Sequence, residues 1–129
     1  MLKRGFKQMM TEANAVIETM AVRDALAAVD EGDVLFVDVR ETVERNESGG
    51  VAGSVHAPRG FLEFMADPES PMHKPELMSG KLLVLYCASG GRSAFAAKTL
   101  IDMGYDPDRV CHMAGGFSAW KEAGGPTEN

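Results

Sequence analysis

The 129-residue sequence has no excess of basic charge and no long apolar run. Its 13 lysines and arginines are outnumbered by 19 aspartates and glutamates, which gives a formal net charge of −6. Proteins that bind nucleic acids or acidic membranes need a cationic surface, so we expect neither kind of partner. The longest uncharged apolar stretches, such as residues 82–88, fall far short of the roughly 18 residues that a membrane span requires, so we expect no span.

Cysteine and histidine are also scarce. Cys87 and Cys111 could pair in principle, but we expect both to be reduced in a cytoplasmic protein, with Cys111 in the core. The three histidines, His56, His73 and His112, are scattered without metal-ligand spacing, and no Cys-x-x-Cys motif accompanies them. We therefore expect no metal site. No continuous apolar core follows the basic residues near the N-terminus, so we expect no secretory signal.

The rest of the composition, 45% hydrophobic and 25% charged residues, is that of one ordinary globular domain. Segments predicted as strands lie at residues 16–19, 34–39, 82–86 and 109–114, with a shorter one within 51–58. Segments predicted as helices lie between and after them, at residues 22–29, 41–47, 59–66, 93–103 and 117–123. Strands separated by helices predict an α/β fold, with a central parallel sheet of about five strands and helices on both faces.

Residues 2–14 carry apolar side chains at helical spacing and are predicted to form an amphipathic helix ahead of the sheet. We expect this helix to pack on the domain or on a second copy of the chain. A helix that lies on a membrane surface is the less favoured alternative, because Glu12 interrupts its basic character. We divide the chain into an N-terminal helical extension, residues 1–15, and one domain, residues 16–129.

The stretch around Cys87 carries the predicted chemistry. The apolar run at residues 82–86 is followed by a turn of small residues, Ala88-Ser89-Gly90-Gly91, and then by a helix that begins near Arg92. The small turn lets backbone N–H groups surround the cysteine, and the helix N-terminus and Arg92 bring positive charge to the same place. These effects favour a thiolate, so we expect the pKa of Cys87 to lie below the free value of about 8.5.

Cys87 is therefore interpreted as an activated nucleophile in an anion-binding loop, rather than as a buried structural cysteine. The loop residues predicted to bind the anion are Ala88, Ser89, Gly90, Gly91, Arg92 and Ser93. The Ser93 hydroxyl is expected to cap the helix rather than to take part in chemistry. Arg59 follows the third strand at the same sheet edge, and we treat it as a further anion contact or, equally, as a plain surface arginine.

Three motifs of the sequence resemble the rhodanese-like domain family. Tyr86-Cys87-Ala88-Ser89-Gly90-Gly91-Arg92-Ser93 resembles its active-site signature, Tyr-Cys-x-x-Gly-x-Arg-Ser, position by position. Residues 34–41 resemble its strand ending in Asp-x-Arg, here Asp38 and Arg40. Residues 115–120 with 124–126 resemble its C-terminal signature, so that the resemblance extends over about residues 16–126. Residues 49–54 depart from the family pattern because they lack its His and Pro, and we expect a looser loop there.

The resemblance implies a sulfurtransferase with the rhodanese-like fold and no cofactor. Cys87 would take sulfane sulfur from thiosulfate or a persulfide and pass it to a thiol or to cyanide, by thiosulfate:cyanide sulfurtransferase-like chemistry. Arg92 would help to define the pocket, while Asp38 and Arg40 would brace the loop. The implied partners are small sulfur donors and acceptors or a protein persulfide, and the chain is expected to be a monomer or homodimer.

Two other functions remain open from the sequence. Cysteine-dependent phosphatases and arsenate reductases use a Cys-x5-Arg loop, whereas four residues separate Cys87 from Arg92, which favours a ring suited to one sulfur atom. A non-enzymatic interaction or sulfur-sensing module is the other alternative, although inactive relatives usually lack the nucleophile. Because Arg92 is the only cation in the loop, we expect weak thiosulfate affinity, with a KM near or above about 1 mM.

Overall fold

The computed structural model describes residues 1–129. The main sheet contains β1 (Glu18–Met20), β2 (Val34–Asp38), β4 (Val55–His56), β5 (Leu82–Tyr86) and β6 (Val110–Met113). The helices are α1 (Phe6–Val16), α2 (Val22–Ala28), α3 (Thr42–Ser48), α4 (Leu62–Ala66), α5 (Gly91–Met103) and α6 (Gly116–Glu122). Short 3-10 helices are η1 (Arg59–Phe61), η2 (Pro75–Met78) and η3 (Pro107–Arg109). A small second sheet contains β3 (Gly50–Val51) and β7 (Thr127–Glu128).

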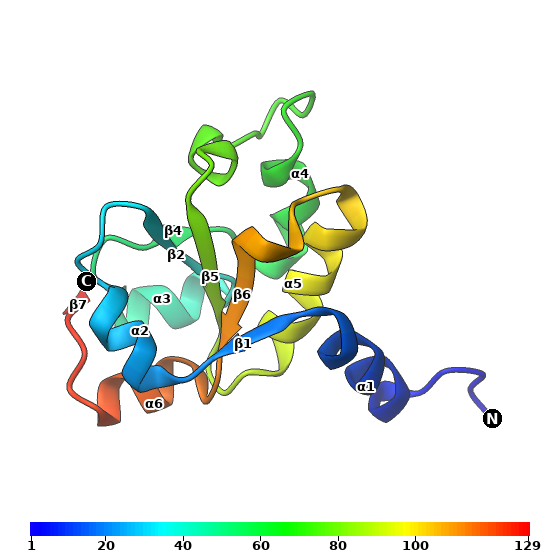
Figure 1. The fold of residues 1–129 in the computed structure, drawn as a ribbon, viewed down its shortest axis with the longest axis horizontal. Coiled ribbons are helices and arrows are strands. Elements are labelled where there is room, and N and C mark those ends of the chain that lie inside the picture. The colour runs from blue at the N-terminus through cyan, green and yellow to red at the C-terminus, as the bar shows by residue number, and fades with distance from the viewer.

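The five strands of the main sheet lie in the order β1-β6-β5-β2-β4, and every pair is parallel. Helices α2, α3 and α6 lie on one side of this sheet, and α1, α4 and α5 lie on the other (Figure 1). The predicted parallel sheet of about five strands with helices on both faces is therefore confirmed. None of the helices has the length and apolar character needed to cross a membrane.

The central strand β5 supplies side chains to both layers of the core. Leu83 and Leu85 pack in the core on the α5 side, whereas Val84 and Tyr86 pack in the core on the α6 side. This alternation is the two-residue period of a strand that is covered on both faces. Cys87 continues the alternation beyond the end of β5, so its side chain lies on the α5 side.

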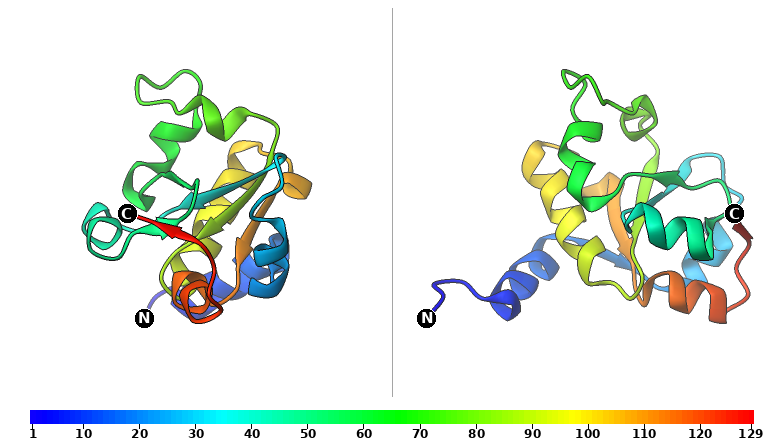
Figure 2. Two further views of the ribbon diagram at one scale, coloured as in Figure 1. Left: turned by 90° about the vertical axis from the view of Figure 1, so that its left-hand side faces the viewer. Right: turned by 180° about the vertical axis from the view of Figure 1, so that it is seen from behind.

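The predicted N-terminal helix forms and packs against α5. Ala13 is fully buried, and the Phe6 ring meets the Phe95 ring edge-on at a centroid distance of 6.2 Å. Helix α1 continues to Val16, so its last turn crosses the division predicted between residues 15 and 16. The first residues of the chain extend away from the rest of the molecule, as Figure 1 and the right-hand view of Figure 2 show.

The segment that departs from the family pattern is held in place rather than left loose. Gly50 and Val51 pair antiparallel with β7, a pairing that the sequence analysis did not predict. The Val51 N–H donates to the Tyr86 hydroxyl at 3.0 Å, and the Gly53 N–H donates to the Glu128 carboxylate at 2.6 Å. Pairing with the C-terminal strand thus places this segment in a second small sheet, where a looser loop was expected.

Candidate active site

Cys87 lies between the end of β5 and the start of α5, as the sequence predicts, and its surface is 1% exposed. Two backbone N–H groups donate to its sulfur, from Gly90 at 3.1 Å and from Ser93 at 3.4 Å. The carboxyl ends of the parallel strands meet at this edge, where α/β sheets commonly place their ligands. The loop therefore surrounds the sulfur with hydrogen-bond donors.

Two glycines allow the loop to take this shape. Gly90 has φ of 121°, a backbone conformation open to glycine, and it directly precedes the first residue of α5. On the other side of the loop, a Cβ on Gly116 would lie 2.6 Å from the carbonyl oxygens of Cys87 and Ala88. Only glycine therefore lets α6 approach the loop this closely.

Helix α6 holds the backbone carbonyls of the loop. The Phe117 N–H donates to the Cys87 carbonyl at 2.8 Å, and the Ser118 N–H donates to the Ala88 carbonyl at 3.1 Å. These are orphan N–H groups at the start of a helix, which need an acceptor outside it. With its first carbonyls held by α6, the loop is free to direct its N–H groups toward the sulfur.

The pKa of Cys87 is lower than that of an ordinary thiol. Burial, the largest single effect, opposes ionisation, but the hydrogen bonds from the Ser93 N–H and hydroxyl and from the N–H groups of Gly90 and Ser89 together outweigh it. The other cysteine, Cys111, has no such donors, and burial raises its pKa to about 11. The pKa of one thiol in the chain is therefore lowered, and the pKa of the other is raised.

Ser93 has a different role from the one predicted. Gly90 is the N-cap of α5 and no side chain caps the helix, so the prediction that Ser93 caps it is wrong. Its hydroxyl lies 3.6 Å from the Cys87 sulfur and 3.1 Å from the Gly90 carbonyl oxygen. It also lies 3.1 Å from Nδ1 of His112. Ser93 therefore lies between the Cys87 sulfur and a buried histidine.

The position of His112 in the sequence was weighed only for metal binding, so this contact was missed. The explanation lies in the register of the strands: in the parallel pair of β5 and β6, His112 lies opposite Leu85, two residues before Cys87. Side chains two residues apart in a strand share a face. The register, unlike the spacing along the chain, places His112 near the site.

Arg92 is turned toward α3. Its guanidinium makes two hydrogen bonds to the Glu44 carboxylate, at 2.6 and 2.9 Å, and these lower the pKa of Glu44 to about 2. The pKa of Arg92 is raised by Glu44 first, and the charge of Cys87 adds to the effect. The cation predicted for the loop is therefore shared with a carboxylate that the sequence analysis did not identify.

Asp38 and Arg40 form a buried ion pair beside the loop. The Arg40 guanidinium donates to both carboxylate oxygens of Asp38, at 3.0 and 2.7 Å. It also lies over the Phe117 ring, 4.4 Å from the ring centroid, and Phe117 in turn holds the Cys87 carbonyl. The pair therefore contacts the residue that holds the loop, and its bracing role stays a prediction.

Arg59 does not reach the Cys87 loop. Its guanidinium donates to Glu63 at 2.9 Å and to Thr99 of α5 at 3.1 Å. Thr99 is eight residues along α5 from Gly91, which corresponds to about 12 Å at about 1.5 Å per residue. The position of Arg59 therefore fits a surface arginine rather than an anion contact in the Cys87 loop.

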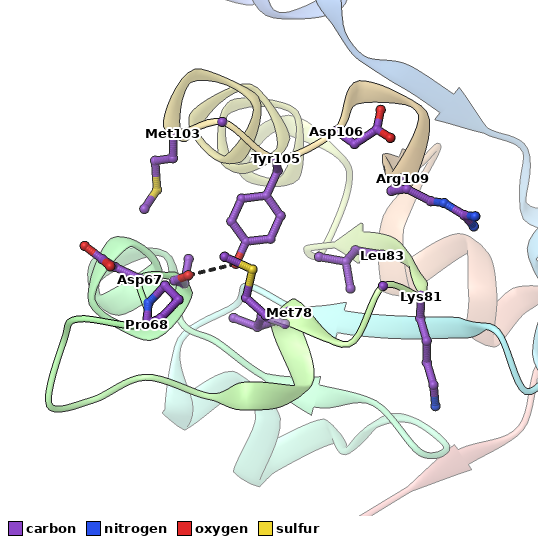
Figure 3. A pocket seen from close by; sticks show the side chains of 13 residues that line it. Asp67, Pro68, Met78, Lys81, Leu83, Met103, Tyr105, Asp106 and Arg109 are labelled. Atoms are coloured by element: carbon purple, nitrogen blue, oxygen red, sulfur yellow. Dashed lines mark hydrogen bonds between the residues drawn. The ribbon is translucent and has the colours of Figure 1, made fainter.

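Two of the three hollows in the molecule lie at opposite ends of the parallel strands. One of about 500 Å³ borders the loop at Ala88, and its charged lining residues are Arg40, Glu44, Glu47, Lys121 and Glu122. A larger hollow of about 680 Å³ lies at the other end, around the start of β5, where Tyr105, Leu83 and Met78 line it (Figure 3). No loop residue contributes to this larger hollow. Of these two hollows, the smaller and more acidic one thus borders the Cys87 loop.

Comparisons with known proteins identify the family of this chain. Residues 21–123 match the family described as Rhodanese-like domain. A sulfurtransferase from Allochromatium vinosum is 32% identical over 97 residues, which cover 75% of this chain and 80% of that protein.

Two solved structures add to the comparison. A Rhodopseudomonas palustris protein of unknown function, described as a possible tyrosine phosphatase, is 48% identical with a TM-score of 0.92, covering 99% of this chain and 97% of that one. The homodimeric polysulfide-sulfur transferase of Wolinella succinogenes is 27% identical with a TM-score of 0.69, covering 95% and 86%. The matched segment and the fold together show that this chain belongs to the rhodanese-like domain family, which includes sulfurtransferases.

Proposed function

We propose that this protein is a sulfurtransferase that carries sulfane sulfur on Cys87 as a persulfide. The observation that carries the proposal is the Cys87 sulfur, which accepts hydrogen bonds from the N–H groups of Gly90 and Ser93. A thiolate is the nucleophilic form of cysteine, and these donors favour it. The sulfurtransferase relatives support the same chemistry.

The first half-reaction loads the cysteine. The Cys87 thiolate attacks the outer sulfur of the donor, so that a new S–S bond forms while the bond between that sulfur and the donor breaks. With thiosulfate, the leaving group is sulfite, which departs with the bonding electron pair. The product is a persulfide with one negative charge on its outer sulfur, and backbone N–H groups are suited to stabilise such a charge.

The second half-reaction returns the cysteine to its starting state. A nucleophilic acceptor, cyanide or a thiolate, attacks the outer sulfur, and the S–S bond breaks with its electron pair on the Cys87 sulfur. Cyanide becomes thiocyanate, and a thiol acceptor becomes a persulfide. Because the donor product leaves before the acceptor binds, ping-pong kinetics follow.

The donor we favour is a persulfide rather than thiosulfate. Glu44 accepts hydrogen bonds from both terminal nitrogens of Arg92, and Glu47 and Glu122 line the hollow beside it. A dianionic donor must therefore approach an acidic surface and compete with Glu44 for the one cation of the loop. A persulfide attached to a thiol or a protein carries less charge and meets less repulsion.

A phosphatase is the second candidate, because the Rhodopseudomonas palustris relative is described as a possible tyrosine phosphatase. The test measures both activities on the same preparation: sulfur transfer from a small-molecule persulfide to cyanide, and hydrolysis of an aryl phosphate. We expect ping-pong sulfur transfer that Cys87→Ser abolishes and Cys111→Ser retains. Aryl phosphate turnover without sulfur transfer from any donor would overturn the proposal.

A further inference from the structure

His112 is a buried titratable group that the proposed function does not use. It lies on β6 with 6% of its surface exposed, and its Nδ1 is 3.1 Å from the Ser93 hydroxyl oxygen. The same oxygen is 3.6 Å from the Cys87 sulfur. Strands β5 and β6 bring the cysteine and the histidine to one face of the sheet, and α5 places Ser93 between them.

We propose that Ser93 and His112 form a hydrogen-bonded chain that carries the thiol proton away from Cys87 and then holds the thiolate. This proposal deepens the proposed function and rests on it for the role of Cys87 as nucleophile. In it, His112 is a positioning residue, because it acts on the sulfur only through Ser93.

The chain has two states that differ by one proton. In the thiol state, the Cys87 S–H donates to the Ser93 oxygen, the Ser93 O–H donates to Nδ1, and the histidine proton is on Nε2. On ionisation, the thiol proton moves to the Ser93 oxygen, the hydroxyl proton moves to Nδ1, and the Nε2 proton leaves to solvent. One proton is released, Cys87 gains one negative charge, and His112 ends neutral with its proton on Nδ1.

In the thiolate state the same contacts remain, but each donor and its acceptor have exchanged roles. The Nδ1–H now donates to the Ser93 oxygen, which leaves the hydroxyl proton to the sulfur or to the Gly90 carbonyl, 3.1 Å away. Hydrogen bonds to an ionised acceptor are roughly twice as strong as neutral ones, so the sulfur is the favoured acceptor. His112 thus prevents the Ser93 proton from being drawn away toward the ring.

The second ring nitrogen provides the exit for the proton. Nδ1 is the ring nitrogen with a partner in the protein, and no buried side-chain nitrogen or oxygen lacks one, so Nε2 reaches solvent. Burial lowers the pKa of His112, which disfavours a lasting imidazolium. The ring therefore passes the proton on rather than keeping it.

The charged groups on the surrounding elements make no ion pair with the His112 ring. Beside His112 in the sheet lie the uncharged Leu85 of β5 and Thr19 of β1. Glu18, in register with Cys111, belongs to the opposite face of the sheet. On the packed helices α5 and α1 and their flanks, the ion pairs are Arg92–Glu44, Lys98–Asp102 and Arg4–Glu12, and Lys3 and Lys7 are exposed. Burial and the Ser93 contact thus remain the main influences on the ring.

The test follows the ionisation of Cys87 without any sulfur donor. Alkylation by iodoacetamide is measured across pH, and mass spectrometry assigns the product to Cys87 or to Cys111. We expect Ser93→Ala and His112→Leu each to raise the midpoint for Cys87 by about one pH unit, roughly the effect of one hydrogen bond. The double variant should shift it no further than Ser93→Ala alone, because His112 acts through Ser93.

A matched variant and a measurement on the wild-type protein complete the test. His112→Asn keeps an N–H donor near the position of Nδ1 and should retain the wild-type midpoint. In the wild-type protein, nitrogen NMR of the His112 ring should report the Nε2–H tautomer below the Cys87 midpoint and the Nδ1–H tautomer above it. One tautomer at both pH values, or a His112→Leu shift that persists in the Ser93→Ala background, would overturn the proposal.

These readouts separate the two proposals. If the Cys87 midpoint depends on His112 but no sulfur is taken up, the proposed function fails and the chain of hydrogen bonds stands. If Cys87 takes up sulfur while His112 keeps one tautomer, the chain fails and the proposed function stands.

Discussion

At the scale of single residues, reactivity depends on the donors around each side chain rather than on its exposure. Cys87 and Cys111 are both buried, yet their pKa values move in opposite directions. Burial alone raises a thiol pKa, and the N–H groups around Cys87 together with the Ser93 hydroxyl reverse that effect. Arg92 shows the same dependence on surroundings, because Glu44 determines how much of its charge an incoming anion meets.

Neutralising Glu44 should release Arg92 to the donor. We expect Glu44→Gln to lower the KM for thiosulfate by about two- to fivefold, since a part-exposed ion pair is worth up to about 1 kcal/mol. The KM for a small-molecule persulfide donor, which carries less charge than thiosulfate, should change less, because such a donor gains less from the guanidinium. Steady-state kinetics with both donors provide the measurement.

Glu47→Gln is the matched control, because Glu47 lines the same hollow but makes no ion pair with Arg92. It removes the same charge from the surface and should lower the thiosulfate KM less than Glu44→Gln does. Equal effects of the two variants would show that general charge, rather than competition for Arg92, controls donor affinity.

At the scale of secondary-structure elements, the site depends on how closely α6 approaches the loop between β5 and α5. The first N–H groups of α6 hold the carbonyls of Cys87 and Ala88. Gly116 makes this contact possible, with φ of 61° and no room for a Cβ. Helix α6 is therefore part of the machinery that orients the loop.

A methyl group at position 116 should separate α6 from the loop. We expect Gly116→Ala to destabilise the protein by about 1–3 kcal/mol, because it adds a clash to an unfavourable backbone conformation. Sulfur uptake by Cys87 should fall, and the Cys87 pKa should rise. Thermal denaturation and the pH profile of alkylation are the measurements.

Gly124→Ala separates the effect of backbone strain from the effect of the clash with the loop. Gly124 has φ of 79°, but a Cβ there would meet nothing within 4 Å. This variant should lose some stability from backbone strain and keep its activity. If Gly116→Ala likewise keeps full sulfur uptake, the role given to α6 is contradicted.

The sequence predicts local features of this site better than contacts between distant segments. An apolar run, a turn of small residues and helical spacing are enough to place Cys87 between a strand and a helix. The contacts of Ser93 with His112 and of Arg92 with Glu44 join residues 19 and 48 positions apart, so no local pattern reveals them. Strand β7 was missed for a related reason, because two residues are too few to show an alternating pattern.

At the scale of the whole molecule, one buried ion pair connects the sheet with the elements that cover its carboxyl edge. Asp38, at the end of β2, accepts hydrogen bonds from Arg40 and from Arg45 of α3. Arg40 also donates to Ser48 at the end of α3. Burial raises the pKa of Asp38, but the hydrogen bonds from Arg40 and Arg45 outweigh it and leave that pKa lowered.

This direction makes the stability dependent on pH. A carboxyl group whose pKa is lower in the folded than in the unfolded protein contributes stability above the unfolded value, about 3.9 for Asp, and loses it as the pH falls through the folded value. We therefore expect the free energy of unfolding of the wild-type protein to decrease as the pH is lowered below about 5. Urea denaturation at several pH values provides the measurement.

Asp38→Asn should remove part of this dependence. It leaves the buried Arg40 without its charged partner, so we expect a loss of about 3–5 kcal/mol at pH 7 and a smaller further loss at low pH. Wild-type stability of the variant at pH 7, or an unchanged pH dependence, would contradict the role of the pair in holding the carboxyl edge together.

The most direct test of the central claim is to locate sulfur on the protein. The purified chain is incubated with a small-molecule persulfide or thiosulfate, and mass spectrometry maps an added mass of about 32 Da, that of one sulfur atom. We expect this mass on Cys87, with Cys111 unmodified, and its loss on addition of cyanide. An unmodified Cys87 with every donor, or equal modification of both cysteines, would contradict the claim that the loop makes Cys87 a selective sulfur carrier.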